Sequence, residues 1–534
     1  MSLKNKFSNF KKEELSLEND KFFTFLKENY LAKNLDLNEL LELNIKNEDF
    51  LKVFARSLNM EFMDFERVDE NLCAKMPTSF MQELEFVPLK ADETNIYILC
   101  VKNFNLENLE RIQSFFMDKI LKLYISDSFK IHKILKELAI KEKLEILSFK
   151  LKEEWEKGLK EEQSFVSQIF DFIIKEALNL KASDIHIEGL ENGALIRFRI
   201  DGVLSFFCHL QKEVYTALVF YIKHLSHLNV AQQRKAQDGS FELKIEDKKY
   251  DFRISTLPLL YGESVVMRIL RHDEIFLSLD NLHFDEFNLT LLKKAIASPH
   301  GMILLTGPTG SGKSTTLYAC LNALKSIEKK IITAEDPIEY KMSLVQQIAL
   351  NSKAGLDFNN ALRAILRQDP DIIMIGEIRD EESLDIAIKA SLTGHLLLST
   401  LHTNDALSAI DRLLNMNANP YLIAHSLNLI IAQRLVRKLC NYCKTKVFND
   451  EFKDYFYEPS GCIRCNKTGF LGRELVAEVL FIDENLSKLI LNLSSKKELL
   501  EQARKNGFKT MFELGLIKAR QGIISINELL RVIK

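Results

Sequence analysis

An apolar run that opens into a glycine-rich loop sets strong limits on the fold of the second half of this chain. Residues Met302 to Thr306 read MILLT, and Gly-Pro-Thr-Gly-Ser-Gly-Lys-Ser follows at positions 307–314. This is G-x-x-x-x-G-K-[ST] between a predicted strand and a predicted helix, the context that separates a phosphate-binding P-loop from a chance match. The glycines let backbone N–H groups turn toward phosphate oxygens, and the helix adds its positive end. The sequence therefore predicts a nucleoside triphosphate site.

Each position in this loop has an expected task. Lys313 is predicted to reach the β- and γ-phosphates, and the Ser314 hydroxyl to bind the Mg²⁺ that accompanies ATP. The other predicted nucleotide contacts are Gly307, Pro308, Thr309, Gly310, Ser311, Gly312 and Thr315. The alternative, a glycine-rich turn without a ligand, would leave the match with its Lys-Ser pair unexplained.

Length and composition predict a multidomain protein. At 534 residues the chain exceeds what one hydrophobic core supports. A formal net charge of −3 gives no general attraction to nucleic acid, so we expect no direct nucleic-acid partner. The N-terminus lacks the apolar core of a signal peptide, and no run approaches the roughly 18 apolar residues of a membrane span. We therefore expect a cytoplasmic protein.

Changes in pattern predict three domains. In residues 1–150, Lys/Glu/Leu-rich helices are predicted up to about residue 70, and short strands follow at FVPLK and NIYILCV, which indicates an N-terminal α+β docking domain. In residues 151–280, a helix from Ser164 to Leu180 precedes strands at DIHIE, ALIRFRIDGVL, FELKI, YDFRIST and ESVVMRIL, which predicts a small α+β domain. Residues 281–534 alternate strands and helices, which predicts a parallel sheet covered by helices. Its strands are expected at 302–306, 331–334, 372–376 and 396–401.

Carboxylates follow the second and third strands of this predicted sheet. Glu335 and Asp336 lie at the carboxyl edge where open α/β sheets bind ligands, which favours a metal-bound or water-polarising role, most of all for Glu335. Glu377 closes the third strand and is the candidate catalytic base that orients the attacking water. Most P-loop enzymes carry an Asp before this Glu, but Gly376 stands here. Mg²⁺ coordination is therefore expected to involve Glu335, Asp336 or water.

Histidines and arginines supply further candidates. His395 and His402 bracket the fourth strand; a strand histidine is more often structural, but the pairing favours a phosphate-sensing role for His402 and leaves His395 open. Phosphoryl transfer builds negative charge that a guanidinium from a neighbouring element can neutralise. Arg253 and Arg268 of the preceding domain are the stronger candidates, and Arg199 the weaker. A surface arginine on a strand is the alternative for all three.

Two C-x-x-C pairs predict a metal site near the C-terminus. Cys440 and Cys443 are followed, after 18 intervening residues, by Cys462 and Cys465, which fits a tetrahedral Cys₄ zinc site. Four thiolates leave no open coordination position, so the Zn²⁺ is expected to hold a loop. We place this zinc subdomain at 437–475, and a helical C-terminal part at 480–534. Basic residues around the cysteines suit a solvated face or anionic lipid headgroups.

Taken together, these segments resemble the ATPases that power type II secretion, type IV pilus assembly and competence pseudopili. The resemblance runs from about Glu161 to the C-terminus and rests on motifs such as RFRIDG (197–202), GPTGSGKSTTLY (307–318), ITAEDPIEY (332–340), LRQDPDIIMIGEIRD (366–380) and AQRLVRKLC (432–440). It implies a Walker A motif at 307–314, an Asp box at 335–339, a Walker B motif at 372–377 and a His box at 395–402.

The resemblance also implies an architecture and partners. The expected fold is multidomain α/β: a RecA-like P-loop ATPase domain with a zinc subdomain, preceded by a small PAS-like α+β domain and the docking domain. A homo-hexamer is expected, in which each ATPase domain contacts the next subunit's α+β domain. Its partners would be an inner-membrane platform protein, an assembly partner with a cytoplasmic domain and, indirectly, pilin-like subunits. The cysteine pairs and the long N-terminal region resemble the branch of the family that assembles filaments, so a motor that extends a filament is favoured over one that retracts it.

Two other classes of function remain as alternatives. A nucleic-acid translocase that grips its substrate with the zinc lobe lacks a basic stripe interleaved with aromatic residues. A scaffold that binds ATP only as a structural switch would not need a carboxylate at Glu377. The sequence leaves open whether the motor serves secretion, piliation or DNA uptake.

Overall fold

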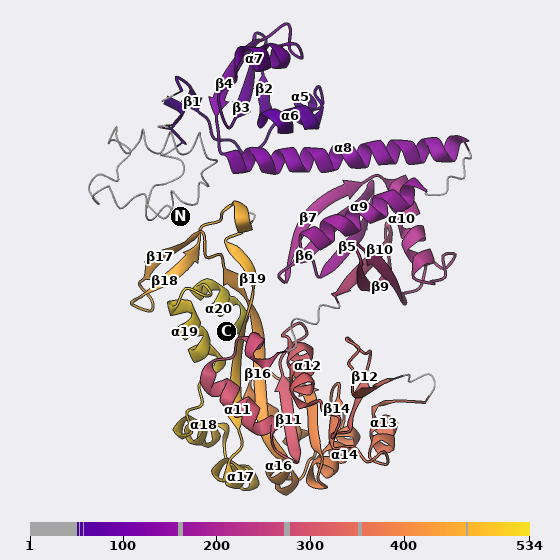
Figure 1. The fold of residues 1–534 in the computed structure, drawn as a ribbon, viewed down its shortest axis with the longest axis vertical. Helices are drawn as coiled ribbons and strands as arrows, with labels where there is room; N and C mark the ends of the chain where they lie inside the picture. The colour runs from indigo at the N-terminus through magenta and orange to yellow at the C-terminus, as the bar shows by residue number, and fades with distance from the viewer. Residues whose placement is uncertain are drawn as a thin grey trace. The chain divides into compact units, whose positions relative to one another are not determined.

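The structure is a computed structural model that describes residues 51–52, 54–56, 58–157, 164–271, 278–350, 355–465 and 468–533. The chain forms two compact units (Figure 1). Unit 1 is built mainly from the described residues up to Ile269, and unit 2 mainly from Leu270 onward. Among the described helices, none combines the length and the apolar composition needed to cross a membrane. The part of the predicted N-terminal helices before residue 51 lies outside the described residues, and the helix prediction is wrong at Glu61–Phe62, which form a strand that pairs with a later strand.

The first sheet of unit 1 has the strand order β1-β4-β3-β2. Its strands are β1 (Glu61–Phe62), β2 (Phe86–Ala91), β3 (Asn95–Cys100) and β4 (Ile120–Ile125). The predicted strands at FVPLK and NIYILCV are confirmed as β2 and β3, which pair antiparallel, whereas β3 and β4 pair parallel. Around them lie α5 (Glu70–Cys73), α6 (Thr78–Leu84), α7 (Leu106–Gln113) and the long α8 (Ser128–Lys157). Buried Phe86, Ile98 and Leu99 form part of the core that joins these elements.

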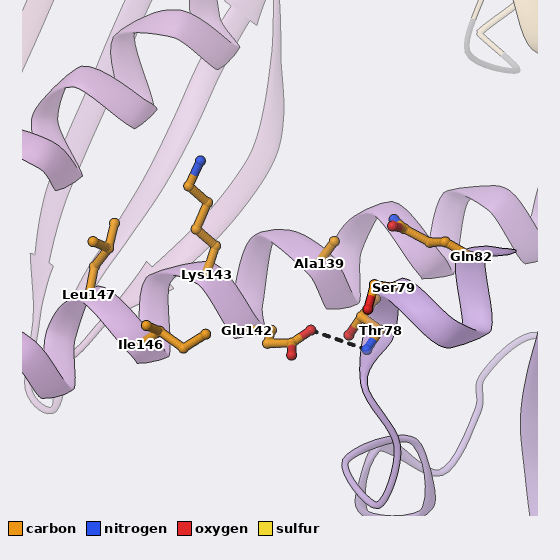
Figure 2. Close-up of a pocket in the computed structure, with 8 residues that line it drawn as sticks. All are labelled: Thr78, Ser79, Gln82, Ala139, Glu142, Lys143, Ile146 and Leu147. Carbon is orange, nitrogen blue, oxygen red and sulfur yellow. Dashed lines mark hydrogen bonds between the residues drawn. The ribbon is translucent and has the colours of Figure 1, made fainter.

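A groove separates α6 from part of α8 (Figure 2). The backbone N–H of Thr78, the first residue of α6, donates to a Glu142 carboxylate oxygen at 3.3 Å and so ties the start of α6 to α8. The groove is lined by Thr78, Ser79, Gln82, Ala139, Glu142, Lys143, Ile146 and Leu147.

The second sheet of unit 1 has the order β7-β6-β5-β10-β9-β8. Its strands are β5 (Asp184–Leu190), β6 (Gly193–Ile200), β7 (Val203–Leu210), β8 (Gln237–Ile245), β9 (Lys248–Leu259) and β10 (Gly262–Arg271). Two helices accompany it, α9 (Phe165–Asn179) and α10 (Lys212–Leu225). The predicted helix at 164–180 is confirmed as α9, whose N-cap is Ser164.

One strand prediction in this sheet is wrong. ALIRFRIDGVL forms two strands, because Asp201 (φ 48°) and Gly202 (φ 84°) make a tight turn between β6 and β7. An Asp-Gly pair is the usual signal for such a two-residue hairpin, since both positions need positive φ. The apolar residues on either side of the turn concealed it.

Unit 2 is organised around a seven-stranded sheet of order β13-β12-β14-β15-β11-β16-β19. Its strands are β11 (Gly301–Thr306), β12 (Ile331–Glu335), β13 (Val345–Ala349), β14 (Ile372–Ile375), β15 (Leu396–Leu401), β16 (Leu427–Leu439) and β19 (Phe470–Phe481). The four predicted strands are confirmed. The sheet is parallel from β13 to β16, as expected, but β19 pairs antiparallel with β16 at the edge.

Helices bury both faces of this sheet. One core cluster joins α11 (Glu286–Ile296) and α12 (Lys313–Leu324) to the strands. The other joins the strands to α13 (Phe358–Ile365), α14 (Glu381–Leu392), α15 (Ala406–Asn415), α16 (Pro420–Ser426), α17 (Glu484–Leu491), α18 (Lys496–Lys505), α19 (Met511–Arg520) and α20 (Ile526–Ile533). A hairpin of β17 (Lys444–Asn449) and β18 (Asp454–Pro459) extends beyond the sheet.

Candidate active site

Four neighbouring parallel strands end at one edge of the seven-stranded sheet. β11 pairs with β15, β15 with β14, and β14 with β12, all in parallel. Parallel strands carry the residues that follow them to the same edge, where open α/β sheets bind ligands. The residues brought there are Gly307 after β11, Glu335 at the end of β12, Glu377 after β14 and His402 after β15.

The loop between β11 and α12 depends on glycine at two places. Gly307 has a φ of 143°, and a Cβ there would lie 2.6 Å from the carbonyl oxygen of Gln433 on β16. Gly312 caps α12 with a φ of 91°, a conformation that side chains other than glycine rarely adopt. The loop thus lies at the positive N-terminus of a buried helix, the geometry that favours a bound anion.

Lys313 is the first residue of α12, directly after this loop. Its Nζ donates to the carbonyl oxygens of Gly307 at 2.7 Å and Pro308 at 3.1 Å, so the side chain turns back over the loop. Burial lowers the pKa of Lys313, the Glu377 carboxylate raises it in part, and the Arg434 cation lowers it further. Ser314 follows and is exposed.

Glu377 lies in a small charged cluster at the end of β14. One carboxylate oxygen accepts a hydrogen bond from Arg379 Nε at 2.6 Å, and the other lies 3.3 Å from His402 Nε2. Burial alone would raise the pKa of Glu377, but the hydrogen bonds and charges of Arg379 and His402 outweigh it and hold that pKa below its usual range. Glu377 is therefore a carboxylate at neutral pH, able to accept a hydrogen bond from water.

Glu335 is placed differently, since its side chain is buried. Its carboxylate accepts hydrogen bonds from the Tyr318 hydroxyl, from Thr333 Oγ1 at 2.6 Å and from Gln347 Nε2 at 3.1 Å. Burial, together with the Glu335 carboxylate, raises the pKa of Tyr318, so the tyrosine stays a donor. These bonds fix Glu335 in one orientation, while the neighbouring Asp336 is exposed.

The two histidines of the fourth strand lie at opposite edges of the sheet. His402 follows β15 and meets Glu377, whereas His395 precedes β15 at the other end. His395 Nδ1 lies 2.9 Å from the carbonyl oxygen of Ala390 in α14, and 3.3 Å from Thr393 Oγ1. The structure therefore brings His402 to the P-loop edge and leaves His395 at the end of α14.

The candidate arginines lie in unit 1. Arg268 on β10 donates through Nε to Asp184 on β5 at 3.0 Å, and Arg199 on β6 lies 3.8 Å from the same buried carboxylate. Arg253 stands on β9 and is partly buried. Arg199 and Arg268 are thus joined by one carboxylate on a strand face of this sheet.

Sequence reasoning missed three residues that complete the P-loop edge. Tyr318 holds Glu335, Arg379 holds Glu377, and Gln433 Nε2 donates to the Ser311 carbonyl oxygen at 2.9 Å. All three stand inside segments that carried the family resemblance. No spacing rule assigns them a role, because their partners are set by packing between distant parts of the chain.

The four cysteines come together as predicted by their spacing. Their Sγ atoms all lie within 4.8 Å of one another, and all four residues are buried. The Cys462 and Cys465 sulfurs are 3.7 Å apart, close to the roughly 3.8 Å edge of a tetrahedron with metal–sulfur bonds of about 2.3 Å. The four sulfurs are arranged so that they could hold one metal ion as a closed set of ligands.

Comparison with known proteins identifies related sequences over most of this chain. The profile of the family described as "Type II/IV secretion system protein" matches residues 159–531, and that of the "MshEN domain" matches residues 58–143. Type II secretion system protein E of Dickeya dadantii is 45% identical over 385 residues, which cover 70% of this chain and 77% of that protein. The type IV pilus assembly ATPase PilB of Myxococcus xanthus is 42% identical over 378 residues, 68% of this chain and 67% of PilB.

A further relative extends the match, and one solved structure shares the fold. Type II secretion system ATPase E of Vibrio cholerae is 39% identical over 438 residues, which cover 80% of this chain and 87% of that protein. The crystal structure of the Legionella pneumophila ATPase DotB matches with a TM-score of 0.53 and 23% identity, over 68% of this chain and 94% of DotB. At this identity the likeness to DotB concerns the fold alone.

Proposed function

Since this chain belongs to the family of type II/IV secretion system proteins, we infer that it hydrolyses ATP to drive assembly of a type II secretion pseudopilus or a type IV pilus. The relatives that span two thirds or more of both chains are named as type II secretion proteins E and as a pilus assembly ATPase. The chain is accordingly an ATPase of the secretion and pilus-assembly type.

One observation carries the enzymatic part of this function. The P-loop and Glu377 follow strands of one parallel sheet and lie at its same edge, close enough for Glu377 to influence the pKa of Lys313. ATP hydrolysis needs a phosphate cradle, and a group that orients water toward the terminal phosphate. In our proposal, residues of one edge meet both requirements.

The residues have the following roles in our proposal. Lys313 and the backbone N–H groups of the loop bind the phosphates, and Ser314 binds the Mg²⁺ that enters with ATP. Glu377 accepts a hydrogen bond from the attacking water, while His402 and Arg379 hold it charged and in place. His402 thereby lies where it can respond to the terminal phosphate. Glu335, held by Tyr318, supports the metal side of the pocket together with the exposed Asp336.

We propose zinc as the metal of the cysteine cluster. Four cysteine sulfurs within 4.8 Å of one another suit Zn²⁺, which has no redox chemistry and accepts a closed Cys₄ set. Bound there, the ion would crosslink two loops and supply no chemistry to hydrolysis. Elemental analysis of protein purified without chelators should give about one zinc per chain for a Cys₄ site; protein without a stoichiometric metal would contradict this assignment.

The assembly and location are also proposals. We propose a homo-hexamer at the cytoplasmic face of the inner membrane, bound to a platform protein and an assembly partner with a cytoplasmic domain. In it, a RecA-like ATPase domain (281–534) meets the PAS-like domain (151–280) of the next subunit, which supplies Arg253 and Arg268. The N-terminal residues up to about 150 serve as the docking domain. The support is the family match.

ATP hydrolysis by purified protein tests this function. Wild-type protein is expected to release phosphate from ATP, and Lys313→Ala to release none above background while keeping its fold and metal. Inactive wild-type hexamer, or an active Lys313→Ala variant, would contradict the proposal. Salt-sensitive stimulation by DNA would instead support the translocase alternative.

A further inference from the structure

Arg434 reaches across the phosphate loop from a strand that no motif assigns to catalysis. It stands on β16, where Ala432 is the register partner of Thr306, the last residue of β11. A Cβ on Gly307 would lie 3.1 Å from its Nη1, and its Nη2 donates to the carbonyl oxygen of Asn404 at 3.2 Å and to Asn404 Oδ1 at 3.3 Å. The side chain therefore spans from β16, past the start of the P-loop, to the loop that follows β15.

The positive charge of Arg434 is bonded to carbonyl groups rather than to carboxylates. Its described hydrogen bonds go to the oxygens of Gln433 and Asn404. Burial lowers the pKa of Arg434, and the more distant carboxylates of Glu478 and Asp405 offset this only in part. Arg434 is partly buried, and even partial burial of a cation without a paired anion is unfavourable. The site therefore favours an anion that enters from outside the chain.

The carboxylates that act on Arg434 from a distance have partners of their own. Glu478 accepts the backbone N–H groups of Ala406 and Met511, each at 2.7 Å. Asp405 caps α15 through the Ser408 backbone N–H at 2.7 Å, and also pairs with Lys496 at 3.0 Å. Neither is held against the guanidinium.

The surroundings of Arg434 indicate which part of the nucleotide it faces. Both Arg434 and Glu377 act electrostatically on Lys313, the residue expected to reach the β- and γ-phosphates. Asn404, which binds the guanidinium, is two residues from His402, and His402 Nε2 lies 3.3 Å from Glu377. Arg434 thus contacts the start of the phosphate loop and the loop after β15, whose His402 meets the group proposed to orient water.

We propose that Arg434 binds the terminal phosphate of ATP within its own subunit and neutralises the charge that develops there during hydrolysis. This inference rests on the function proposed above and adds a catalytic arginine in cis to those expected from a neighbouring subunit. A guanidinium suits the task because its planar donors can engage two phosphate oxygens while it keeps its charge.

Nucleotide binding distinguishes this role from a structural one. In Arg434→Ala, the affinity for the non-hydrolysable analogue AMP-PNP should fall by about 10-fold or more, as for a lost charged contact, and kcat by about 100-fold, as when one transition-state donor is removed. The affinity for ADP should change little, because ADP lacks the terminal phosphate. Arg434→Lys keeps the charge and should give intermediate values. Isothermal titration calorimetry and phosphate release on the full chain measure both quantities.

Two matched variants serve as controls. Asn404→Ala removes one acceptor of Arg434 but keeps the Asn404 carbonyl oxygen and the guanidinium, so our proposal predicts a much smaller loss of AMP-PNP affinity than in Arg434→Ala, and an equal loss would contradict it. Lys438→Ala removes another cation from β16 and should leave nucleotide affinity unchanged.

The outcomes separate this inference from the general function. Equal loss of AMP-PNP and ADP affinity, or unchanged AMP-PNP affinity, in Arg434→Ala would overturn the phosphate contact even if the wild type is an active ATPase. Inactive wild-type protein would contradict the function itself. If Arg434→Ala unfolds, Arg434→Lys carries the same ADP-versus-AMP-PNP comparison, and an equal change for both ligands again overturns the proposal.

Discussion

The seven-stranded sheet of unit 2 and the six-stranded sheet of unit 1 differ in where their polar side chains lie. Every residue of β11 is buried, with Ile303 in the core cluster of one face and Leu304 in that of the other. In β5, the apolar Ile185 and Ile187 are buried, and they alternate with polar residues. The seven-stranded sheet is covered on both faces, and the six-stranded sheet is covered on one.

This difference decides where chemistry can be located. In the doubly covered strands β11, β12, β14 and β15, charged groups stand only at or after the strand ends, and Glu377 and His402 lie there. In the other sheet, charged groups lie along the strands and pair with one another, as Arg197 does with Glu188 at 2.6 Å and Arg268 with Asp184 at 3.0 Å. The seven-stranded sheet therefore gathers its charged groups in one compact site, whereas the six-stranded sheet has a charged face.

The largest expected effect concerns the strand ends. Glu377→Gln should lower kcat by about 10³-fold, because an amide cannot replace the carboxylate that orients the water. Binding of AMP-PNP should be retained, since the P-loop is untouched. Phosphate release and calorimetry measure the two properties. Turnover near the wild-type rate would remove Glu377 from the chemistry.

Alanine substitutions in the two sheets test whether each sheet is covered on both faces or on one. Ile303→Ala and Leu304→Ala should each cost about 3 kcal/mol of stability, because neighbouring residues of a doubly covered strand are both buried. In β5, Ile187→Ala should cost a similar amount, but its neighbour Glu188→Ala less than about 1 kcal/mol. Denaturant unfolding of each variant measures this. Equal costs for Ile187 and Glu188 would refute the one-sided description of that sheet.

A substitution on the charged face of the six-stranded sheet is expected to have a smaller effect on catalysis. Arg268→Ala should lower kcat by about 100-fold if its guanidinium reaches the nucleotide of another subunit, the loss typical for one stabilising donor. Arg197→Ala, which removes an arginine bonded to Glu188 on the same sheet, is the matched control. Indistinguishable rates for the two variants would mean that Arg268 serves only its pair with Asp184.

The smallest expected effect is a shift in pH dependence. Arg379 and His402 hold the pKa of Glu377 below its usual range, so Glu377 stays charged until the pH falls through that lowered pKa. Arg379→Gln removes one of the groups that offset the effect of burial, so the pKa of Glu377 should rise. The acid limb of the pH profile of kcat should then move toward neutral pH. Rates measured from pH 4.5 upward, in buffers of constant ionic strength, check this. A profile identical to the wild type would show that Arg379 does not tune Glu377.

Much of the fold was predictable because local sequence patterns determine its strands and helices. The strands β11, β12, β14 and β15 are apolar runs between turn signals, and a strand buried on both faces must have that composition. The edge strand β19 was not foreseen, since an antiparallel partner for β16 depends on the path of the whole C-terminal region. The turn at Asp201 was missed although its signal was present.

The sequence by itself determined the P-loop and the cysteine cluster, because each is defined by residue types at short, fixed spacing. Only the tertiary structure decided the surroundings: Tyr318 on Glu335, Arg379 on Glu377, and Arg434 beside Gly307. The physical reason is distance along the chain. Arg434 meets Gly307 only because β16 pairs with β11, a contact between residues more than one hundred positions apart that no local periodicity encodes.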